Sequence, residues 1–536
     1  MEGHRDPKTG RVKQQVVRHI GYAETGEDIS RLKTLGQHLK AELLEARQPC
    51  LFSPQTLAEM ALETQENLPE NPKDYAVDDV RKLRTKDQHM TGIHTVFGKP
   101  FDRIFEGILN PPSQKKYAKN VLRDLVMARI ARPDSKRGSV RFLEQNCGIK
   151  LNLDGVYRAM DELDDTVIAR LQDRAFEASK QLFHEKLDVV FYDATTLYFE
   201  SFTEDDLRAK GFSKDHKSQE VQVLLSIFVT HAGIPLGYEL FPGSTYEGHT
   251  LVKALETLKT RFEVGRVVFV ADSGMLNQQN LELLEAHGYV YLVGARLKNM
   301  AAPITQAILS EAGYESLNGD TQDQVSAKVI ALDQGRKLVI SHSTKRARKD
   351  AHDREVAFEK LRKKLKKGAS ASAGAGQKYL KLTGSSNAEI DPDKVEKAAR
   401  WDGFCGIMTN MEQVDAAEVI QHYRGLWQVE ETFRVTKHDL RIRPIYHWTQ
   451  KRVKAHIALC FMALVCVRHV EYRMRLFNKP MSPERIRQAC LTVGITTLEH
   501  VEDHRVFAVP TKPSEDAKAI FKANDLPLST TPYLCC

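Results

Sequence analysis

The spacing of hydrophobic and polar positions changes near residue 187 and divides the chain into two parts. From about Gly26 to Glu185, apolar residues recur three to five positions apart, which is the spacing of amphipathic helices. From Leu187 onward, short apolar runs bounded by turn residues replace that spacing and predict strands. We therefore expect a mainly helical N-terminal region followed by a domain built around a β-sheet.

The elements predicted after residue 186 follow one another in a definite order. Three strands come first, and then a helix, a strand, a helix and a strand. The strands cover residues 187–193, 221–229, 235–241, 267–271 and 289–293, and the helices cover 250–261 and 277–287. This is the order of an RNase H-like fold. We therefore predict an α/β class, with a mixed five-stranded sheet flanked by helices.

The regular succession of strands and helices is interrupted between residues 300 and 400. Further strand patterns are followed there by two basic runs, residues 345–349 and 362–367, and by a stretch of Gly, Ala and Ser at 368–376 that is typical of a flexible linker. We interpret the region as a β-containing insertion. The expected organisation is 1–185, a helical region; 186–299, the first part of the core; 300–400, the insertion; 401–475, the second part of the core; and 476–536, a C-terminal helical region and tail.

Two local patterns in the N-terminal region predict particular structures. Residues 5–17 contain the turn sequence Asp-Pro-Lys-Thr-Gly before a strand pattern, and we interpret them as a hairpin whose first arm is nearly missing, as if the chain began inside an element. Ser135 is placed to cap a new helix after Pro133. The basic residues around this break are Arg129, Arg132, Lys136, Arg137 and Arg141. Such a cluster fits a DNA-binding helix-turn-helix and, equally, a solvated face of a helical bundle.

Composition indicates a globular protein but does not show whether the chain binds nucleic acid. Hydrophobic residues make up 42% of the 536, which is globular composition, and a net charge of +7 is too mild to indicate nucleic acid by itself. The eight cysteines lack paired CxxC spacing, so we expect reduced thiols in a cytoplasm. The most apolar run, Ile457 to Val467, is far shorter than the roughly 20 residues of a membrane span, so we predict a buried helix and no membrane partner.

Two aspartates follow strongly apolar runs. Asp193 ends Val-Val-Phe-Tyr, and Asp272 ends Val-Val-Phe-Val-Ala. A carboxylate beside the core is costly to desolvate unless it is paired or bound to a cation. Taken singly, each aspartate is more often a cap or turn residue, but two of them on strands expected to be adjacent favour a metal site.

A third acid, Glu430, lies in a predicted helix. No Pro or Gly interrupts Leu426 to Arg443, and Pro444 marks the stop. Residues seven apart share one helix face, because the drift is only about 20° per heptad. The resulting stripe contains Tyr423, Trp427, Glu430, Arg434, Lys437 and Arg441. The alternative is an ordinary amphipathic helix with an ion pair between Glu430 and Arg434.

Carboxylates from two strands and a late helix can hold two divalent cations about 3.5–4 Å apart, as in-line phosphoryl transfer requires. Mg²⁺ prefers oxygen ligands and keeps water molecules that can serve as nucleophiles. The three acids together therefore favour a metal-dependent phosphoryl transferase over three unrelated surface residues.

At these positions the sequence resembles the DDE transposases of bacterial insertion sequences, in particular the cut-and-paste group with the signature Tyr, two residues, Arg, three residues, Glu, six residues, Lys. Tyr423, Glu430 and Lys437 match the signature, whereas Leu426 stands where the family has Arg. The likeness covers about residues 187–475 and is most specific at the two strand-end aspartates and at this helix.

The resemblance implies that Asp193, Asp272 and Glu430 are the catalytic residues and the ligands of Mg²⁺ or Mn²⁺, with two ions expected. It implies DNA contacts for Tyr423, Trp427, Arg434, Lys437 and Arg441. The expected partner is double-stranded DNA, both the terminal inverted repeats of a transposon and its target, bound by a homodimer. Residues 1–185 would bind the transposon ends. The expected location is the bacterial cytoplasm, in association with the nucleoid.

Two other functions remain open at this stage. An RNase H-like nuclease that hydrolyses DNA without strand transfer would use the same acids, and only a joined DNA product would separate the two activities. An inactive DNA-binding relic of a transposase would fit the unusual N-terminus and the leucine at position 426.

Overall fold

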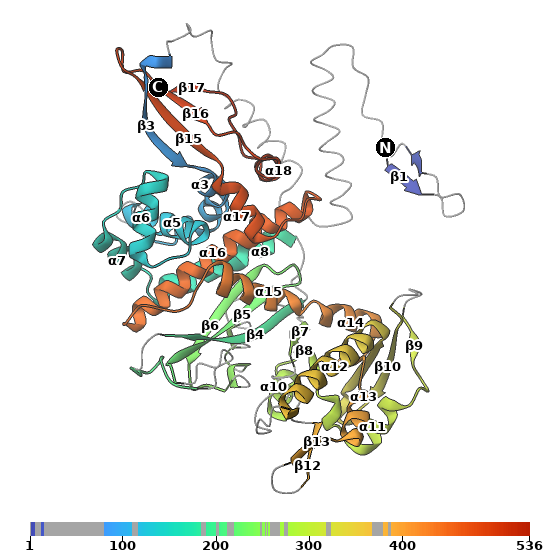
Figure 1. The fold of residues 1–536 in the computed structure, drawn as a ribbon. Helices are drawn as coiled ribbons and strands as arrows, with labels where there is room; N and C mark the ends of the chain where they lie inside the picture. The colour runs from blue at the N-terminus through green and yellow to red at the C-terminus, as the bar shows by residue number, and fades with distance from the viewer. Residues whose placement is uncertain are drawn as a thin grey trace.

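The computed structural model shows how the predicted elements assemble (Figure 1). It describes residues 2–5, 12–15, 80–109, 116–183, 189–199, 203–211, 219–246, 249–251, 253, 256–257, 268–272, 277–317, 323–366, 379–383 and 387–535. The predicted linker at 368–376, most of the predicted helix at 250–261 and the helical pattern before residue 80 lie outside these residues.

Five strands form the predicted central sheet. They are β4 (Val189–Tyr198), β5 (Gln222–Thr230), β6 (Pro235–Pro242), β7 (Val268–Ala271) and β8 (Val290–Ala295). Their spatial order is β6-β5-β4-β7-β8. The first three strands are antiparallel to one another, and β7 and β8 are added in parallel to β4. The mixed sheet and the predicted RNase H-like α/β class are confirmed.

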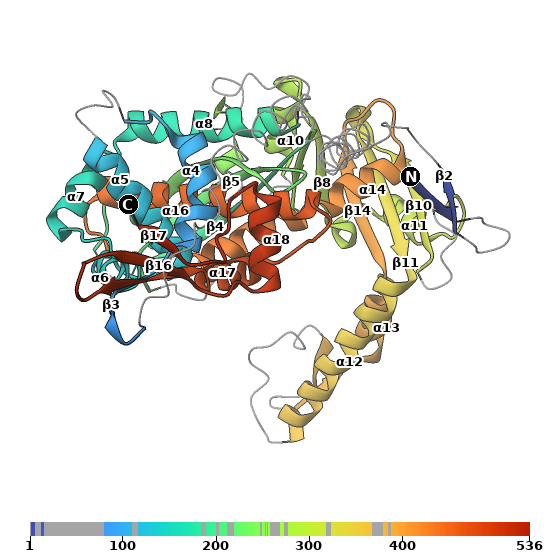
Figure 2. The same cartoon turned by 90° about the horizontal axis from the view of Figure 1, so that it is seen from above.

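Three strands from the predicted insertion and one from the predicted second part of the core extend this sheet. Beyond β8 come β14 (Phe404–Thr409), β11 (Lys337–Ser343), β10 (Val325–Ala331) and β9 (Glu315–Ser316), which gives nine strands in one sheet. The prediction of five strands was therefore incomplete. The helices α12 (Thr344–Lys366) and α13 (Pro392–Ala399) project from the body of the molecule (Figure 2).

The two faces of the sheet bury different sets of side chains. Tyr192 belongs to a hydrophobic cluster with Leu281 and Leu284 of α10 (Gln278–Ala286). Phe191, the neighbour of Tyr192 along β4, belongs instead to the cluster that contains the long helix α16 (Gln450–Leu476). Since successive side chains of a strand point to opposite faces, odd-numbered residues of this part of β4 face the α16 side.

Helix α16 is the predicted buried helix. Among the described residues it is the single helix long and apolar enough to cross a membrane, but 94% of its most apolar window is buried in the protein. The helices that pack against it include α4 (Gly98–Phe105), α5 (Lys116–Ala131), α7 (Leu153–Asp161), α8 (Asp165–Phe183) and α17 (Pro483–Leu491), and α3 (Gly92–Val96) and α6 (Lys136–Cys147) pack on these helices. The described helices of the N-terminal region therefore pack around α16.

The basic cluster at the α5–α6 junction is only partly a surface. Ser135 caps α6 as predicted, because its hydroxyl accepts a hydrogen bond from the amide of Gly138 at 3.1 Å. Arg129 and Lys136, however, are buried: the guanidinium donates to the carbonyl of Arg441, and the ammonium contacts His456. Both interpretations of the cluster therefore apply to only three of its five members, because the exposed ones are Arg132, Arg137 and Arg141.

The C-terminal region contains strands as well as helices, which corrects the prediction of a helical region. The strands β15 (Gly494–His500), β16 (Val506–Pro510) and β17 (Tyr533–Cys535) form a four-stranded sheet with β3 (Leu83–Met90). Helix α18 (Glu515–Ala523) follows β16. The runs that form these strands are too short for a periodicity to distinguish them from helix.

The N-terminal hairpin is confirmed. Strand β1 (Glu2–Arg5) pairs with β2 (Val12–Gln15) in antiparallel register, and Arg5 lies opposite Val12. The two described arms are of equal length, whereas the first arm was expected to be nearly missing.

Candidate active site

The register of two parallel strands brings Asp193 and Asp272 side by side. In the β4–β7 pair, Phe191 lies opposite Val270. Continuing this register by two residues places Asp193 opposite Asp272, which follows the last residue of β7. Neighbouring strands are about 4.8 Å apart. Two carboxylates that are remote in the sequence are therefore neighbours on one edge of the sheet.

Both carboxylates face the side of the sheet on which the signature helix lies. Asp193 is two residues beyond Phe191, so the two side chains point to the same face. Phe191 shares its hydrophobic cluster with Val429 and Phe433, the residues that flank Glu430 on the signature helix. The third acid thus comes from a helix that covers the face bearing the two aspartates.

The helix predicted for residues 426–443 begins within one residue of its predicted start, but Tyr423 lies on a separate helix before it. Helix α14 (Ala416–Arg424) ends at Gly425, and α15 (Trp427–Arg434) begins two residues later. Tight turns join the two helices, since the amide of Leu426 donates to the carbonyl of Tyr423 at 3.0 Å. A Cβ atom on Gly425 would lie 2.5 Å from the Phe191 ring, so the glycine allows the backbone to approach β4 closely.

The same helix also ends differently from the prediction. After α15 comes a π-helical turn, η7 (Val435–Asp439), in which the amide of Leu440 donates to the carbonyl of Val435. A π turn holds more residues than an α turn, so spacings of seven no longer keep side chains on one stripe. Arg441 lies beyond the helix with φ at 43°. Its predicted place on the stripe of Glu430 is therefore wrong.

Tyr423, Glu430 and Lys437 consequently lie on three successive segments, namely α14, α15 and η7. Figure 1 shows α15 against β4 and β5, and α14 over the part of the sheet with β10 and β11. Glu430 is exposed, Tyr423 and Lys437 are partly buried, and Leu426 is buried in the core. The position at which the family carries Arg is thus filled by a packing residue.

Arg434 does not form the ion pair with Glu430 that was the alternative interpretation of the helix. Its guanidinium is held instead by Glu431, through two hydrogen bonds, and lies 3.8 Å from Asp439. The hydrogen bond from Arg434 holds the pKa of Glu431 below its ordinary value. Glu430 is therefore left to serve another purpose.

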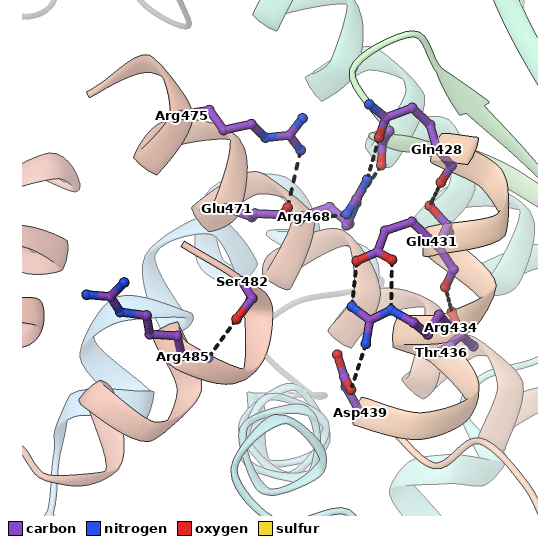
Figure 3. A network of polar contacts seen from close by, with 12 residues as sticks. Gln428, Glu431, Arg434, Thr436, Asp439, Arg468, Glu471, Arg475, Ser482 and Arg485 are labelled. Atoms are coloured by element: carbon purple, nitrogen blue, oxygen red, sulfur yellow. Dashed lines mark hydrogen bonds and ion pairs between the residues drawn. The ribbon is translucent and has the colours of Figure 1, made fainter. Parts of the chain in front are cut away.

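A buried arginine connects α15 to the rest of the molecule (Figure 3). The side chain of Arg468, on α16, is fully buried and donates to Gln428 at 3.0 Å, to the carbonyl of Gly233 at 2.8 Å and to Glu471 at 2.7 Å. Gln428 precedes Glu430 by two residues. This network therefore joins the signature helix, the core helix and the β5–β6 turn.

The pKa of Tyr423 reports the charges around it. Burial raises the pKa most, and the charges of Cys405, Asp272 and Glu430 raise it further, whereas Arg346 lowers it. The phenol is thus protonated at neutral pH and lies within electrostatic reach of two of the three acids. Arg346 comes from the first turn of α12, and the sequence pattern singled out neither its place beside Tyr423 nor that of Cys405.

The three acids have oxygen donors, which suit Mg²⁺ and Mn²⁺. Asp272 and Glu430 are exposed, and Asp193 is half-buried. In the part of the chain that the structure describes, no group of three or more His, Cys, Asp or Glu side chains is close enough to hold a metal ion. The backbone thus aligns two of the acids and brings the helix of the third onto their face, without a preformed coordination shell.

Comparisons with known proteins identify the chain's relatives. A family model described as the transposase DDE domain matches residues 184–466, more than half of the chain. No curated protein sequence matches. The chain is 8% identical to the piggyBac transposase in a synaptic complex with hairpin DNA, over 75% of this chain and 76% of that chain, with a TM-score of 0.40. It is 12% identical to the Mos1 transposase in a paired-end complex with the left transposon end. This match covers 46% of this chain and 69% of that chain, with a TM-score of 0.15.

Proposed function

The chain belongs to the transposase DDE domain family, and from this premise we propose that Asp193, Asp272 and Glu430 are its catalytic residues. The chain is a DNA transposase, an enzyme that cleaves and transfers strands of DNA. The observation that supports the proposal is the β4–β7 register, whose continuation by two residues aligns Asp193 with Asp272, together with the packing of the helix of Glu430 against β4.

Divalent metals are used by this family, and we propose that the three carboxylates hold Mg²⁺ or Mn²⁺, as two ions. Bound there, the cations would neutralise the non-bridging oxygens of a phosphodiester and lower the pKa of a water molecule. The chain's own contribution is to hold the three carboxylates on one sheet face. A covalent protein intermediate is not needed, and the protonated Tyr423 has no role as a nucleophile.

The side chains around the acids suit a DNA phosphate. Tyr423 offers a hydroxyl donor, and Lys437 on η7 offers a positive charge. Arg346 adds a guanidinium from α12, whose charge lowers the pKa of Tyr423. We assign weaker contacts to Trp427, which is 53% exposed, and to Arg441. Arg434 is the weakest candidate, because Glu431 already holds it.

The finer parts of the proposal concern the substrate and the assembly. The spacing of Tyr423, Glu430 and Lys437 supports a member of the bacterial insertion-sequence group that acts on its own terminal inverted repeats. Two DNA ends must be processed together, which favours a homodimer on DNA in the bacterial nucleoid. The region 1–185 would read the end sequence, since phosphate contacts alone carry no sequence information.

The test is cleavage of DNA that carries the ends of the element flanking the gene. With Mg²⁺ or Mn²⁺ the protein should nick this DNA and join it to a target, whereas a nuclease would release ends without a joined product. Asp193→Asn, Asp272→Asn and Glu430→Gln should each lower cleavage by at least about 10³-fold while DNA binding survives. Cleavage that persists in one variant would remove that residue from the assignment, and an inactive wild-type protein would favour a relic.

A further inference from the structure

The segment that joins the signature helix to α16, residues 441–448, alternates between buried and exposed positions. Ile442 and Ile445 are buried, whereas Arg441, Tyr446 and Trp448 are exposed. We call this segment the 441–448 loop. Its alternation fixes one set of side chains in the core and directs the other set into solvent.

The buried side of the loop is firmly attached. The ring of His456 donates to the carbonyl of Ile442 at 3.0 Å, and Arg129 donates to the carbonyl of Arg441 at 3.4 Å. The amide of Ile445 donates a hydrogen bond at 3.4 Å to the carbonyl of Tyr198, at the end of β4. These contacts come from three different elements, so the exposed side chains project from a fixed backbone.

The loop lies on the sheet edge that carries the two aspartates. The amide of Phe199 donates to Val221 on the β5 side, so the carbonyl of Tyr198, which binds Ile445, points to the opposite edge of β4. That is the edge along which β7 runs until Ala271. Tyr198 is five residues beyond Asp193, about 16 Å along the strand. This distance corresponds to about five base pairs of duplex DNA.

The exposed side of the loop has the chemistry of a nucleic-acid surface. Trp448 is 71% exposed and Tyr446 is 59% exposed; in the described part of the chain no large hydrophobic residue is more exposed than these two. The sequence from residue 440 to 470 contains no Asp or Glu. Arg441 and Lys451 are exposed, and they precede and follow the two rings in the sequence. Flat aromatic rings between cations fit bases and phosphates.

We propose that the 441–448 loop binds unpaired DNA bases beside the active site, with Tyr446 and Trp448 stacking on the bases and Arg441 and Lys451 contacting phosphates. The proposal rests on the function as a DNA transposase and extends it to a second contact surface. A fully paired duplex keeps its base faces stacked inside, so the two rings discriminate in favour of a strand whose bases are exposed.

The test measures binding of the full chain to a fluorescein-labelled oligothymidylate of about 20 nucleotides and to the corresponding duplex, in EDTA so that no cleavage occurs. The double variant Tyr446→Ala, Trp448→Ala should raise the Kd for the single strand by at least about 10-fold and change the Kd for the duplex by less than about two-fold. Tyr446→Phe, Trp448→Phe keeps both rings and should retain most of the affinity.

The matched control is Tyr117→Ala, because Tyr117 is another exposed aromatic, on α5, and is 57% exposed. Its removal should leave both affinities unchanged. The proposal is overturned if the wild-type chain does not bind the single strand, if the double alanine variant binds it normally, or if both affinities fall equally. Because this assay needs neither metal nor the three acids, its failure would leave the cleavage test of the proposed function unaffected.

Discussion

The strand pair and the broken helix supply acids to the same site by different means. Asp193 and Asp272 are aligned by the backbone register of β4 and β7, in which the pairs run up to Phe191 and Val270, two residues before the aspartates. Glu430 stands on a segment interrupted by a glycine on one side and a π turn on the other. The strand acids are thus fixed by the backbone of the sheet, whereas the helix acid depends on side-chain contacts.

This difference predicts where the site is most easily damaged. A substitution near β4 or β7 must disrupt a sheet to displace an aspartate. A substitution at the contacts of α15 needs only to remove a buried hydrogen bond or to fill the space above Phe191. We expect the helix side to be the more sensitive of the two, and three substitutions on that side follow in decreasing order of expected effect.

Arg468→Leu should have the largest effect. It leaves Gln428 and the carbonyl of Gly233 without their buried donor, and it removes the charge that Glu471 binds. Breaking such a buried network should lower the free energy of unfolding by about 3 kcal/mol, measured by urea denaturation. Arg485→Leu is the control, because its ion pair with Asp516 is exposed and should matter little. Equal stability of the two variants would contradict the role of the network.

Gly425→Ala should have an intermediate effect. Alanine gains about 1 kcal/mol of helix propensity over glycine, but its methyl group would overlap the Phe191 ring, which costs about 1–3 kcal/mol. We expect a net loss of about 1 kcal/mol in the same measurement, together with slower DNA cleavage. Adding Phe191→Leu to this variant should recover part of both. If the second substitution only adds to the loss, the close approach does not set the position of α15.

Lys437→Ala should have the smallest effect. Loss of one phosphate contact should weaken DNA binding a few-fold and reduce the slope of log affinity against log salt by about 1. The readout is the binding constant over a range of salt concentrations. Lys518→Ala, which removes a lysine paired with Glu515 on α18, should leave the slope unchanged. A Lys437 variant with the wild-type slope would place this lysine outside the DNA interface.

The sheet could be predicted from the sequence because its strands are nearly continuous apolar runs. The residues of β5 are all buried, and β4, β7 and β8 begin within two residues of their predicted starts. The alignment of Asp193 with Asp272 follows from strand order and direction, which the alternation of strands and helices predicts. The two strand acids were therefore within reach of sequence reasoning.

The broken helix and the buried cations could not be predicted in the same way. The break at Gly425 stands one residue before the uninterrupted stretch that indicated a helix, and the π turn at Val435–Asp439 has no pattern of its own. Arg129 and Lys136 are basic residues in a basic cluster, and only the fold brings them partners from more than 300 positions away. Local patterns carry no information about contacts at such sequence separations.

The most direct test of a shared metal site is metal-directed backbone cleavage. Fe²⁺ takes the place of Mg²⁺ in oxygen-ligand sites, and with ascorbate and peroxide it generates radicals that cut the chain close to the ion. We predict cuts around Asp193, Asp272 and Glu430, all suppressed by excess Mg²⁺. Cuts at only one of these segments, or a pattern that Mg²⁺ does not suppress, would contradict the claim that the strand pair and the broken helix hold the metal together.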